Sequence, residues 1–107
     1  MTTDEEKAFL SELEKKLTII ARSGELVLGA RNVERLLRRR RAKAILFSRD
    51  SPDDLRSKIL PLAKRRNVPV FRSSRTNTEL GRLCGRPYVV STLAIIDFGA
   101  ATVPKEF

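Results

Sequence analysis

The sequence predicts an α/β fold, a three-layer α/β/α sandwich with a four-stranded mixed sheet. Short apolar runs of strand length alternate with segments of helical periodicity, which is the element order of an α/β protein. The run at residues 44–47 is apolar throughout, as expected of a central strand covered on both faces. The length of 107 residues, 41% of them apolar, suits a single domain, 1–107, with one buried core.

The first predicted helix covers residues 4–22, where apolar side chains recur at helical spacing. Thr3 and Glu6 have the spacing of a capping box at its start, and Gly24 follows it as a C-cap glycine would. We expect a short strand at residues 26–28.

Gly29 leads from this strand into a helix predicted over residues 31–40, and the strand at 44–47 follows. A strand that passes into a helix through glycine leaves backbone N–H groups at the turn. Those groups attract anions, and the helix dipole adds to the attraction.

A third helix is predicted to begin where Ser51 can cap, Pro52 suits the first helical position and two aspartates follow. Pro61 removes a backbone hydrogen bond inside this pattern, so we expect a short helical piece and then a second one over 61–66. The strand predicted at 68–71 contains a proline, which indicates an edge position or a strand start.

A second capping box precedes a helix predicted over residues 77–84, which Gly85 closes. The apolar residues at 88–90 and 93–96 predict one last strand or a strand pair. The tail after Gly99 is expected to be weakly ordered.

Positive charge is segregated along the chain. The formal net charge of +9 divides into −2 for residues 1–30 and +11 for residues 31–107. Segregated positive charge is expected for a partner with a phosphate backbone. The alternative is a highly charged, thermostable surface, but the bases outnumber the acids too far for ion pairs to use them up.

Composition excludes several kinds of chemistry. With no histidine and with Cys84 as the single cysteine, a Cys/His metal cluster, a histidine base and an internal disulfide are ruled out. The Asp-Phe-Gly tripeptide at 97–99 lacks the loops of a kinase, and Asp53 and Asp54 are better explained as first-turn helix acids. No apolar run is long enough to span a membrane. We expect no enzyme activity, cofactor or metal, and a cytoplasmic location.

The bases concentrate in residues 31–49, where the net charge is +7. Arginine suits RNA because its planar fork can bind phosphate or guanine in two bonds and can stack on bases. Arg31, Asn32 and Arg35 stand at the anion-attracting start of the helix, so we expect them to reach base edges. The later residues are expected to position phosphate, or to form a solvated charged face: Arg38, Arg39, Arg40, Arg41 and Lys43.

Loops beyond the strand ends of an α/β sheet gather on one side. The turn at Gly29, the turn at 49–50 and the loop at 86–89 are therefore expected to form one surface. Exposed Tyr88 and Val89 would receive an unstacked base there, which is how single-stranded or distorted RNA is usually read. The alternative for Tyr88 is a partly buried core aromatic.

Three motifs stand in order along the chain: LVLGAR at 26–31, NTELG at 77–81 and GRPYVVSTLAIID at 85–97. They resemble the L30e family of archaeal and eukaryotic large-subunit ribosomal proteins, within the L7Ae superfamily. The resemblance implies an α/β/α sandwich that binds kink-turn or kink-turn-like rRNA, an internal loop with tandem sheared G·A pairs and a sharp bend. It also implies other ribosomal proteins as partners and a monomer outside the ribosome.

The resemblance implies roles for individual residues. The glycine turn and the start of the second helix would enter the groove beside the G·A pairs, and the last loop would support an extruded nucleotide. The RNA-binding set is Gly29, Arg31, Asn32, Arg35, Arg49, Asp50, Arg86, Tyr88 and Val89. Many superfamily members have Gly-x-Asn-Glu at the glycine turn. This chain has Gly-Ala-Arg-Asn at residues 29–32, which favours the ribosomal branch over the snoRNP branch.

The leading interpretation is a non-enzymatic RNA-binding protein of the large ribosomal subunit. A protein-interaction adaptor, or another ribonucleoprotein component of the same fold, is the alternative, because the acidic amphipathic first helix offers a partner surface. A small nucleotide-binding enzyme has little support in the residues.

Overall fold

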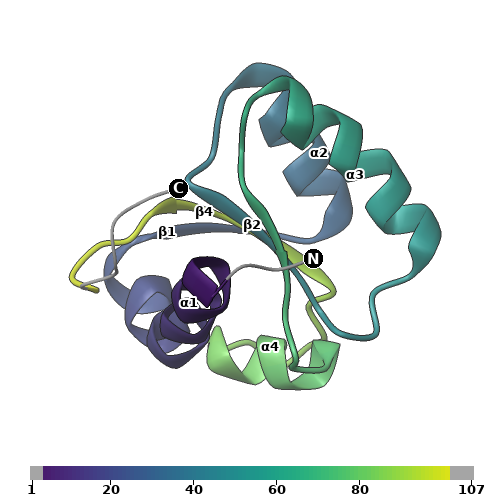
Figure 1. The fold of residues 1–107 in the computed structure, drawn as a ribbon. Helices are drawn as coiled ribbons and strands as arrows, with labels where there is room; N and C mark the ends of the chain where they lie inside the picture. The colour runs from purple at the N-terminus through teal and green to yellow at the C-terminus, as the bar shows by residue number, and fades with distance from the viewer. Residues whose placement is uncertain (1–3, 102–107) are drawn as a thin grey trace.

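The computed structural model describes residues 4–101 and confirms the predicted sandwich and its four-stranded mixed sheet. In chain order the elements are α1 (Asp4–Ser23), β1 (Glu25–Leu28), α2 (Ala30–Arg39), β2 (Ala44–Phe47), α3 (Asp53–Arg65), β3 (Val70–Arg72), α4 (Asn77–Leu83) and β4 (Thr92–Asp97). Figure 1 shows α1 and α4 on one face of the sheet and α2 and α3 on the other.

The strands lie in the order β1-β4-β2-β3. β4 is antiparallel to both β1 and β2, whereas β3 is parallel to β2. The predictions of a central strand at 44–47 and of an edge strand near Pro69 are both confirmed, since β2 is buried throughout and β3 lies at the edge.

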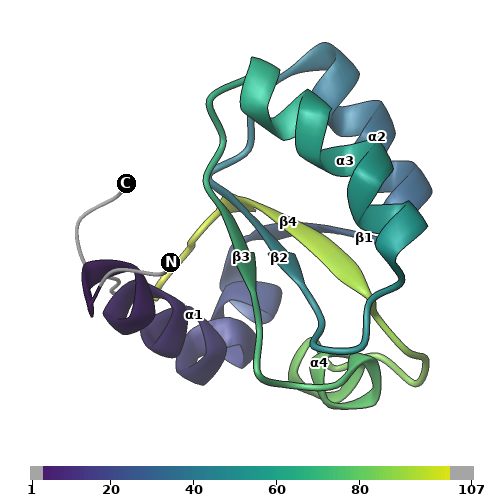
Figure 2. The same cartoon turned by 45° about the vertical axis from the view of Figure 1, so that its right-hand side comes forward.

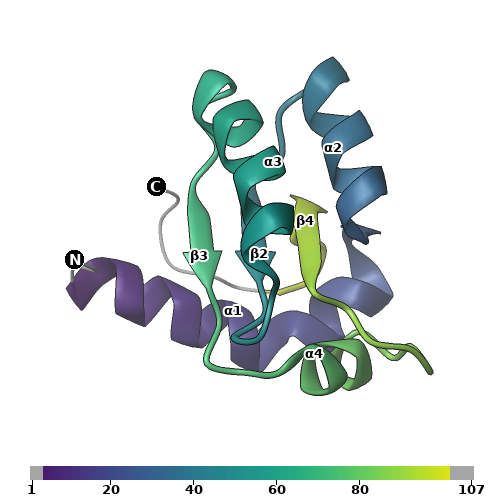
Figure 3. The same ribbon diagram turned by 90° about the vertical axis from the view of Figure 1, so that its right-hand side faces the viewer.

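These strand directions bring several loops to one edge of the sheet. The C-terminal ends of β1, β2 and β3 lie there beside the start of β4. Figure 3 shows α4 with the loop after β2 and the loop before β4, all at the bottom of the view. We name this region the loop edge; it consists of Gly29, the turn at 48–50, and the segments 73–77 and 86–91.

A hydrophobic core lies on each face of the sheet. The core under α1 includes the buried stripe of that helix: Phe9, Leu13, Leu17 and Ile20. The other core lies under α2 and α3, which pack side by side (Figure 2). Ile45 and Leu46 of β2 face different cores, as the two-residue period of a strand requires.

α3 is one continuous helix, so the predicted break at Pro61 is wrong. Pro61 lies on the exposed side of the helix, where the Ser57 carbonyl that loses its partner is open to water. Ile59 and Ala63, on either side of the proline, are both fully buried in the same core. This packing keeps the axis continuous despite the missing bond.

Two helix termini also differ from the prediction. Pro52, and not Ser51, occupies the N-cap of α3. The Ser51 hydroxyl donates to the Ser48 carbonyl oxygen and accepts from the Arg56 guanidinium, both at 2.9 Å, so it caps no backbone N–H of the helix. Gly24 lacks the left-handed backbone of a C-cap glycine. It suits its position for a different reason: a Cβ there would lie 2.1 Å from the Asp97 carbonyl oxygen.

α4 begins and ends as predicted. Thr76 and Glu79 form a complete capping box at its start. At its end the Gly85 N–H donates to the Arg82 carbonyl and the Arg86 N–H donates to the carbonyl of residue 81, which is a Schellman motif.

Between residues 84 and 101 the structure contains one strand, β4, so the prediction of strand structure at 88–90 is wrong. The Val90 N–H donates to the Asn77 carbonyl oxygen at 3.0 Å, which ties this segment to α4 and not to a strand. After β4, the Ala100 N–H donates to the Ser23 hydroxyl at 2.9 Å. The capping box predicted at Thr3 and the tail from residue 102 lie outside the described residues.

Candidate nucleic-acid interface

The start of α2 is a helix N-terminus without a side-chain cap. Gly29 is its N-cap, with φ at 92°, and its N–H donates to the Thr92 carbonyl oxygen at 3.0 Å. No side chain of residues 4–101 caps this helix, and its first turn contains no acid. The N–H groups of the first turn therefore point to an outside acceptor, and the helix dipole favours an anion there.

Arg31, Asn32 and Arg35 are exposed on the first turns of α2. The Asn32 amide nitrogen donates to the Leu28 carbonyl oxygen at 3.0 Å, which holds this side chain over the end of β1. A groove of about 520 Å³ follows the helix from here, lined by Val27, Asn32, Arg35, Leu36, Arg39 and Arg40. The structure thus places Asn32 and Arg35, two of the three predicted base-reading residues, in a basic groove, and Arg31 is exposed on the same helix turn.

The turn at 48–50 presents Arg49 and Asp50, which are both exposed. The Arg49 N–H donates to the Arg75 carbonyl oxygen at 2.8 Å, and the Arg49 carbonyl accepts from the Arg72 guanidinium at 2.7 Å. The Asp50 carboxylate accepts from the Asn77 N–H at 2.9 Å. Asp50 therefore fastens the turn to the start of α4, while Arg49 keeps its side chain on the surface.

The pKa of Asp50 lies below its ordinary value. The neighbouring Ser48 hydroxyl is the main cause, and the Asn77 N–H also contributes. Asp50 is therefore an anion at neutral pH, as its contact with the backbone of α4 requires.

The segment 86–91 presents an apolar pair to solvent. Tyr88 and Val89 are each 56% exposed, which excludes the alternative of a core position for Tyr88. The segment lies directly on α4, since a Cβ on Gly81 would be 2.1 Å from the Tyr88 carbonyl oxygen. Val90 is buried and anchors the end of this loop.

The segment 73–77 joins these parts, and the sequence analysis missed it. It provides the acceptors for the N–H groups of Arg49 and Val90, and the N–H donor for Asp50. The turn at 48–50 and the segment 86–91 are thus held by one short stretch of chain. Two of the three loops that were expected to gather are thus joined through a fourth, while the Gly29 turn is held by the Thr92 carbonyl at the start of β4.

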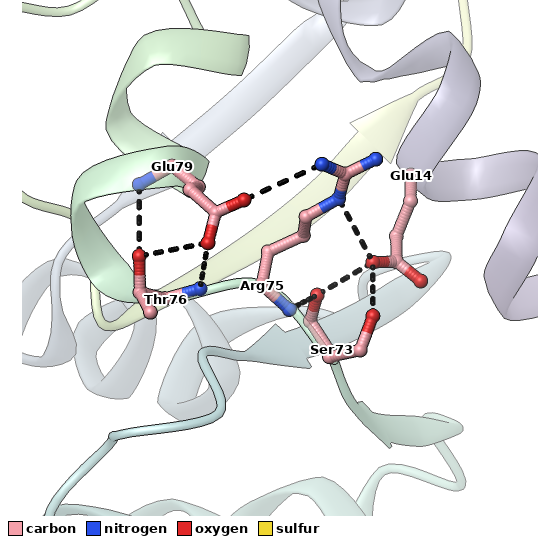
Figure 4. Close-up of polar contacts among 6 residues, drawn as sticks. Glu14, Ser73, Arg75, Thr76 and Glu79 are labelled. Carbon is pink, nitrogen blue, oxygen red and sulfur yellow. Dashed lines mark hydrogen bonds and ion pairs between the residues drawn. The ribbon is translucent and has the colours of Figure 1, made fainter.

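A buried carboxylate fixes this stretch from α1 (Figure 4). Glu14 is 9% exposed and accepts from the Ser73 hydroxyl at 2.8 Å and from the Ser74 hydroxyl at 3.3 Å. Arg75 bridges Glu14 at 3.6 Å and Glu79 at 3.4 Å. A signal was present in the sequence, since Glu14 interrupts the apolar face of a predicted helix.

Glu79 completes the network on the other side (Figure 4). Its carboxylate accepts from the Thr76 N–H at 3.2 Å, which is the main cause of a lowered pKa, and the Thr76 hydroxyl and Arg75 add to it. The segment that positions the loops is therefore held by a carboxylate side chain on each side, Glu14 from α1 and Glu79 from α4.

The residues predicted to position phosphate lie elsewhere. Arg38 and Arg39 are the last residues of α2, and Arg40, Arg41 and Lys43 follow it, so the set lies at the opposite end of this helix from Gly29. Arg38 pairs with Glu34 at 3.3 Å, and the Arg41 guanidinium donates to the Asn67 carbonyl oxygen at 2.8 Å. Arg39 and Arg40 line the groove that begins at Asn32 and Arg35, whereas Arg38, Arg41 and Lys43 do not line it.

The described residues also bear on metal binding, on thiol chemistry and on membrane insertion. No group of three potential metal ligands occurs among residues 4–101. Burial raises the pKa of the Cys84 thiol to about 11, although nearby Arg86 opposes the shift, so this thiol is protonated at neutral pH. In the same range, every helix is too short or too polar to cross a bilayer.

The fold and the loop edge define a small α/β/α protein whose exposed surface combines a helix N-terminus, arginines and an aromatic side chain. Residues 11–104 match the model of the ribosomal protein L7Ae/L30e/S12e/Gadd45 family. The chain belongs to this family, and the resemblance seen in the sequence motifs is confirmed.

Curated relatives are similar over nearly their whole length. Large ribosomal subunit protein eL30 of Methanopyrus kandleri is 33% identical, covering 90% of this chain and 92% of that protein. The eL30 proteins of Neurospora crassa and Sulfurisphaera tokodaii are 32% and 30% identical, covering 96% and 92% of this chain and 94% and 93% of their own lengths. These relatives are named as ribosomal proteins and not as enzymes.

A solved structure supports the fold alone. A protein of unknown function from Bacillus halodurans C superimposes with a TM-score of 0.73 at 21% identity, covering 84% of this chain and 90% of that one.

Proposed function

We propose that this chain is an RNA-binding structural constituent of the large ribosomal subunit that recognises a kink-turn or kink-turn-like internal loop in rRNA. The names of its relatives support the assignment to the ribosome. One observation supports an internal loop as the kind of RNA that is bound. An uncapped helix N-terminus, exposed arginines and an exposed apolar pair lie on the same edge of the sheet.

A regular duplex offers little to such a surface. Its bases are stacked, and the major groove of A-form RNA is too deep and narrow for side chains to read. Tyr88 and Val89 are suited to an unstacked nucleotide, whereas Gly29 and the first amides of α2 are suited to a phosphate. An internal loop with a sharp bend presents both groups close together.

In this proposal the residues contact different parts of the RNA. Arg31 takes the edge of a guanine in two bonds, and Asn32 and Arg35 contact the bases or backbone beside it. Arg49 and Arg86 hold the strand on either side, and Tyr88 with Val89 supports the extruded base. Asp50 acts through the protein, because its carboxylate holds the turn that carries Arg49.

The test compares a kink-turn RNA with a straight duplex of the same length. We expect the kink-turn to bind more tightly, and Arg31→Ala to lower the discrimination by about 1–3 kcal/mol, roughly 5- to 150-fold. Arg22→Ala, at an exposed arginine on α1, is the matched control and is expected to leave the ratio unchanged. Equal affinity of the wild type for the two RNAs would contradict kink-turn recognition.

The setting in the ribosome has separate tests. The chain is expected to sediment with large ribosomal subunits, beside other ribosomal proteins, after a high-salt wash. Light scattering of the purified protein is expected to give the mass of one chain. Loss of the protein from the subunits in the wash, or a dimer mass, would contradict these assignments.

A further inference from the structure

A second basic surface lies at the end of the molecule opposite the loop edge. α2 and α3 both end there, at the top of Figure 3. The residues at 38–43 and 64–66 include eight bases and no acid: Arg38, Arg39, Arg40, Arg41, Lys43, Lys64, Arg65 and Arg66. All of these bases except Arg66 are exposed. We name this surface the far basic end.

Helix capping accounts for part of this charge. Arg66 donates to the Leu37 carbonyl at 2.8 Å and to the Arg38 carbonyl at 2.7 Å, so it caps the end of α2. The C-terminus of a helix carries about half a negative charge, so the two helix ends offset roughly one base. The ion pair between Arg38 and Glu34 offsets one more. Most of the eight positive charges remain without compensation from these sources.

The far basic end is separated from the proposed kink-turn site. At about 1.5 Å per residue, α2 carries the chain roughly 15 Å away from Gly29, and α3 carries it roughly 20 Å away from the turn at 48–50. The phosphates that reach Arg65 are therefore not those beside the Gly29 turn. A hollow of about 230 Å³ lies between the two helices here, lined by Leu37, Arg38, Leu62, Arg65 and Arg66.

We propose that the far basic end binds the sugar-phosphate backbone of a second RNA segment, so that the protein joins two RNA elements. The proposal rests on the proposed function, because the first element is the RNA at the loop edge. Two features favour a backbone over other partners. Residues 38–43 and 64–66 contain no aromatic side chain on which a base would stack. The centre of a protein–protein interface is depleted in charged residues and contains apolar or aromatic anchors, whereas this surface presents eight bases and no aromatic side chain.

The experiment uses the full chain and two RNAs. The protein is first saturated with a kink-turn RNA, and a fluorescent 20-base-pair RNA duplex is then titrated into the complex at several salt concentrations. We expect a ternary complex. Arg41→Gln, Lys43→Gln, Lys64→Gln and Arg65→Gln together, at exposed bases that do not line the groove beside Asn32, are expected to weaken duplex binding and to reduce the slope of log K against log salt by roughly 3 to 4. The same variant is expected to retain its preference for the kink-turn over a duplex.

The controls separate the possible outcomes. A variant with four other exposed bases neutralised (Lys7, Lys15, Arg22 and Lys58, each to Gln) loses the same charge and is expected to retain the ternary complex. Circular dichroism checks that both variants fold. Competition between the duplex and the kink-turn RNA, equal loss in both variants, or binding of polyglutamate but not of duplex would each overturn the proposal. Failure of the proposed function appears separately, as a lack of kink-turn preference before any duplex is added.

Discussion

Replacing Glu14 with alanine is expected to destabilise the protein and to loosen the loop edge. The carboxylate is 9% exposed and accepts one short bond, from Ser73 at 2.8 Å, and one longer bond, from Ser74 at 3.3 Å. A hydrogen bond to a charged group contributes about 1.5–3 kcal/mol, and the longer bond contributes less. Arg75 is 46% exposed, so its ion pair adds at most about 1 kcal/mol.

The sum predicts a loss of about 2–4 kcal/mol in the free energy of unfolding, since the two hydroxyl groups also lose their acceptor. For a chain of this length, that loss lowers Tm by roughly 10–25 °C. Thermal unfolding followed by circular dichroism measures this change. Glu14→Gln keeps the volume and one acceptor oxygen, so it is expected to give an intermediate loss.

Glu12 provides the matched control on the same helix. It pairs with Lys16 at 2.9 Å on the surface, where water screens the pair, so Glu12→Ala is expected to cost much less stability than Glu14→Ala. Hydrogen exchange adds a local measurement, because the N–H groups of Arg49 and Val90 donate to the segment that Glu14 holds. The reasoning is refuted if Glu14→Ala costs no more than Glu12→Ala, or if these two amides keep their protection.

Three further predictions concern the scaffold of the loop edge. Gly81→Ala would place a Cβ 2.1 Å from the Tyr88 carbonyl oxygen, so we expect a displaced 86–89 loop, detectable as shifted NMR signals there; unchanged signals would contradict the close approach. The lowered pKa of Glu79 stabilises the fold above its ordinary pKa of 4.5, and this stabilisation is lost as the pH falls through the lower folded value. Glu79→Gln should therefore flatten the acid side of the stability curve, and an unchanged curve would count against the capping network. Cys84, with a pKa of about 11, is expected to react with a thiol reagent at neutral pH only at the rate of unfolding, and rapid labelling of the native protein would refute this.

Prediction from sequence succeeded where the signal was local. The helical spacing of α1, the apolar run of β2 and the capping box of α4 all depend on neighbours within a few residues, and all three are confirmed. The prediction of a helix break at Pro61 was wrong, because packing against the core outweighs the local loss of one backbone hydrogen bond. The lost backbone bond faces water, while Ile59 and Ala63 hold both halves of the helix in one core.

The sequence predicted which residues of the candidate site are exposed, but it did not predict the segment that holds the loops in place. Exposure of Arg31, Asn32 and Tyr88 agrees with their expected positions. In the segment 73–77 the sequence marked only the start of the α4 capping box and of the NTELG motif, and neither pattern indicates that the segment supports two other loops. Glu14 lies 59 residues from Ser73, a separation across which periodicity carries no information.

By itself the sequence determined the fold class, the family and the basic, uncapped start of α2, because hydrophobic spacing, motif order and charge are all written along the chain. Only the tertiary structure decided which of these residues share a surface. It brought four loops to one edge through hydrogen bonds between distant segments, and it carried the run Arg38 to Arg41 to the other end of the molecule. The physical reason is that strand direction and helix length set the position of a side chain in space, and both depend on how the whole sheet is paired.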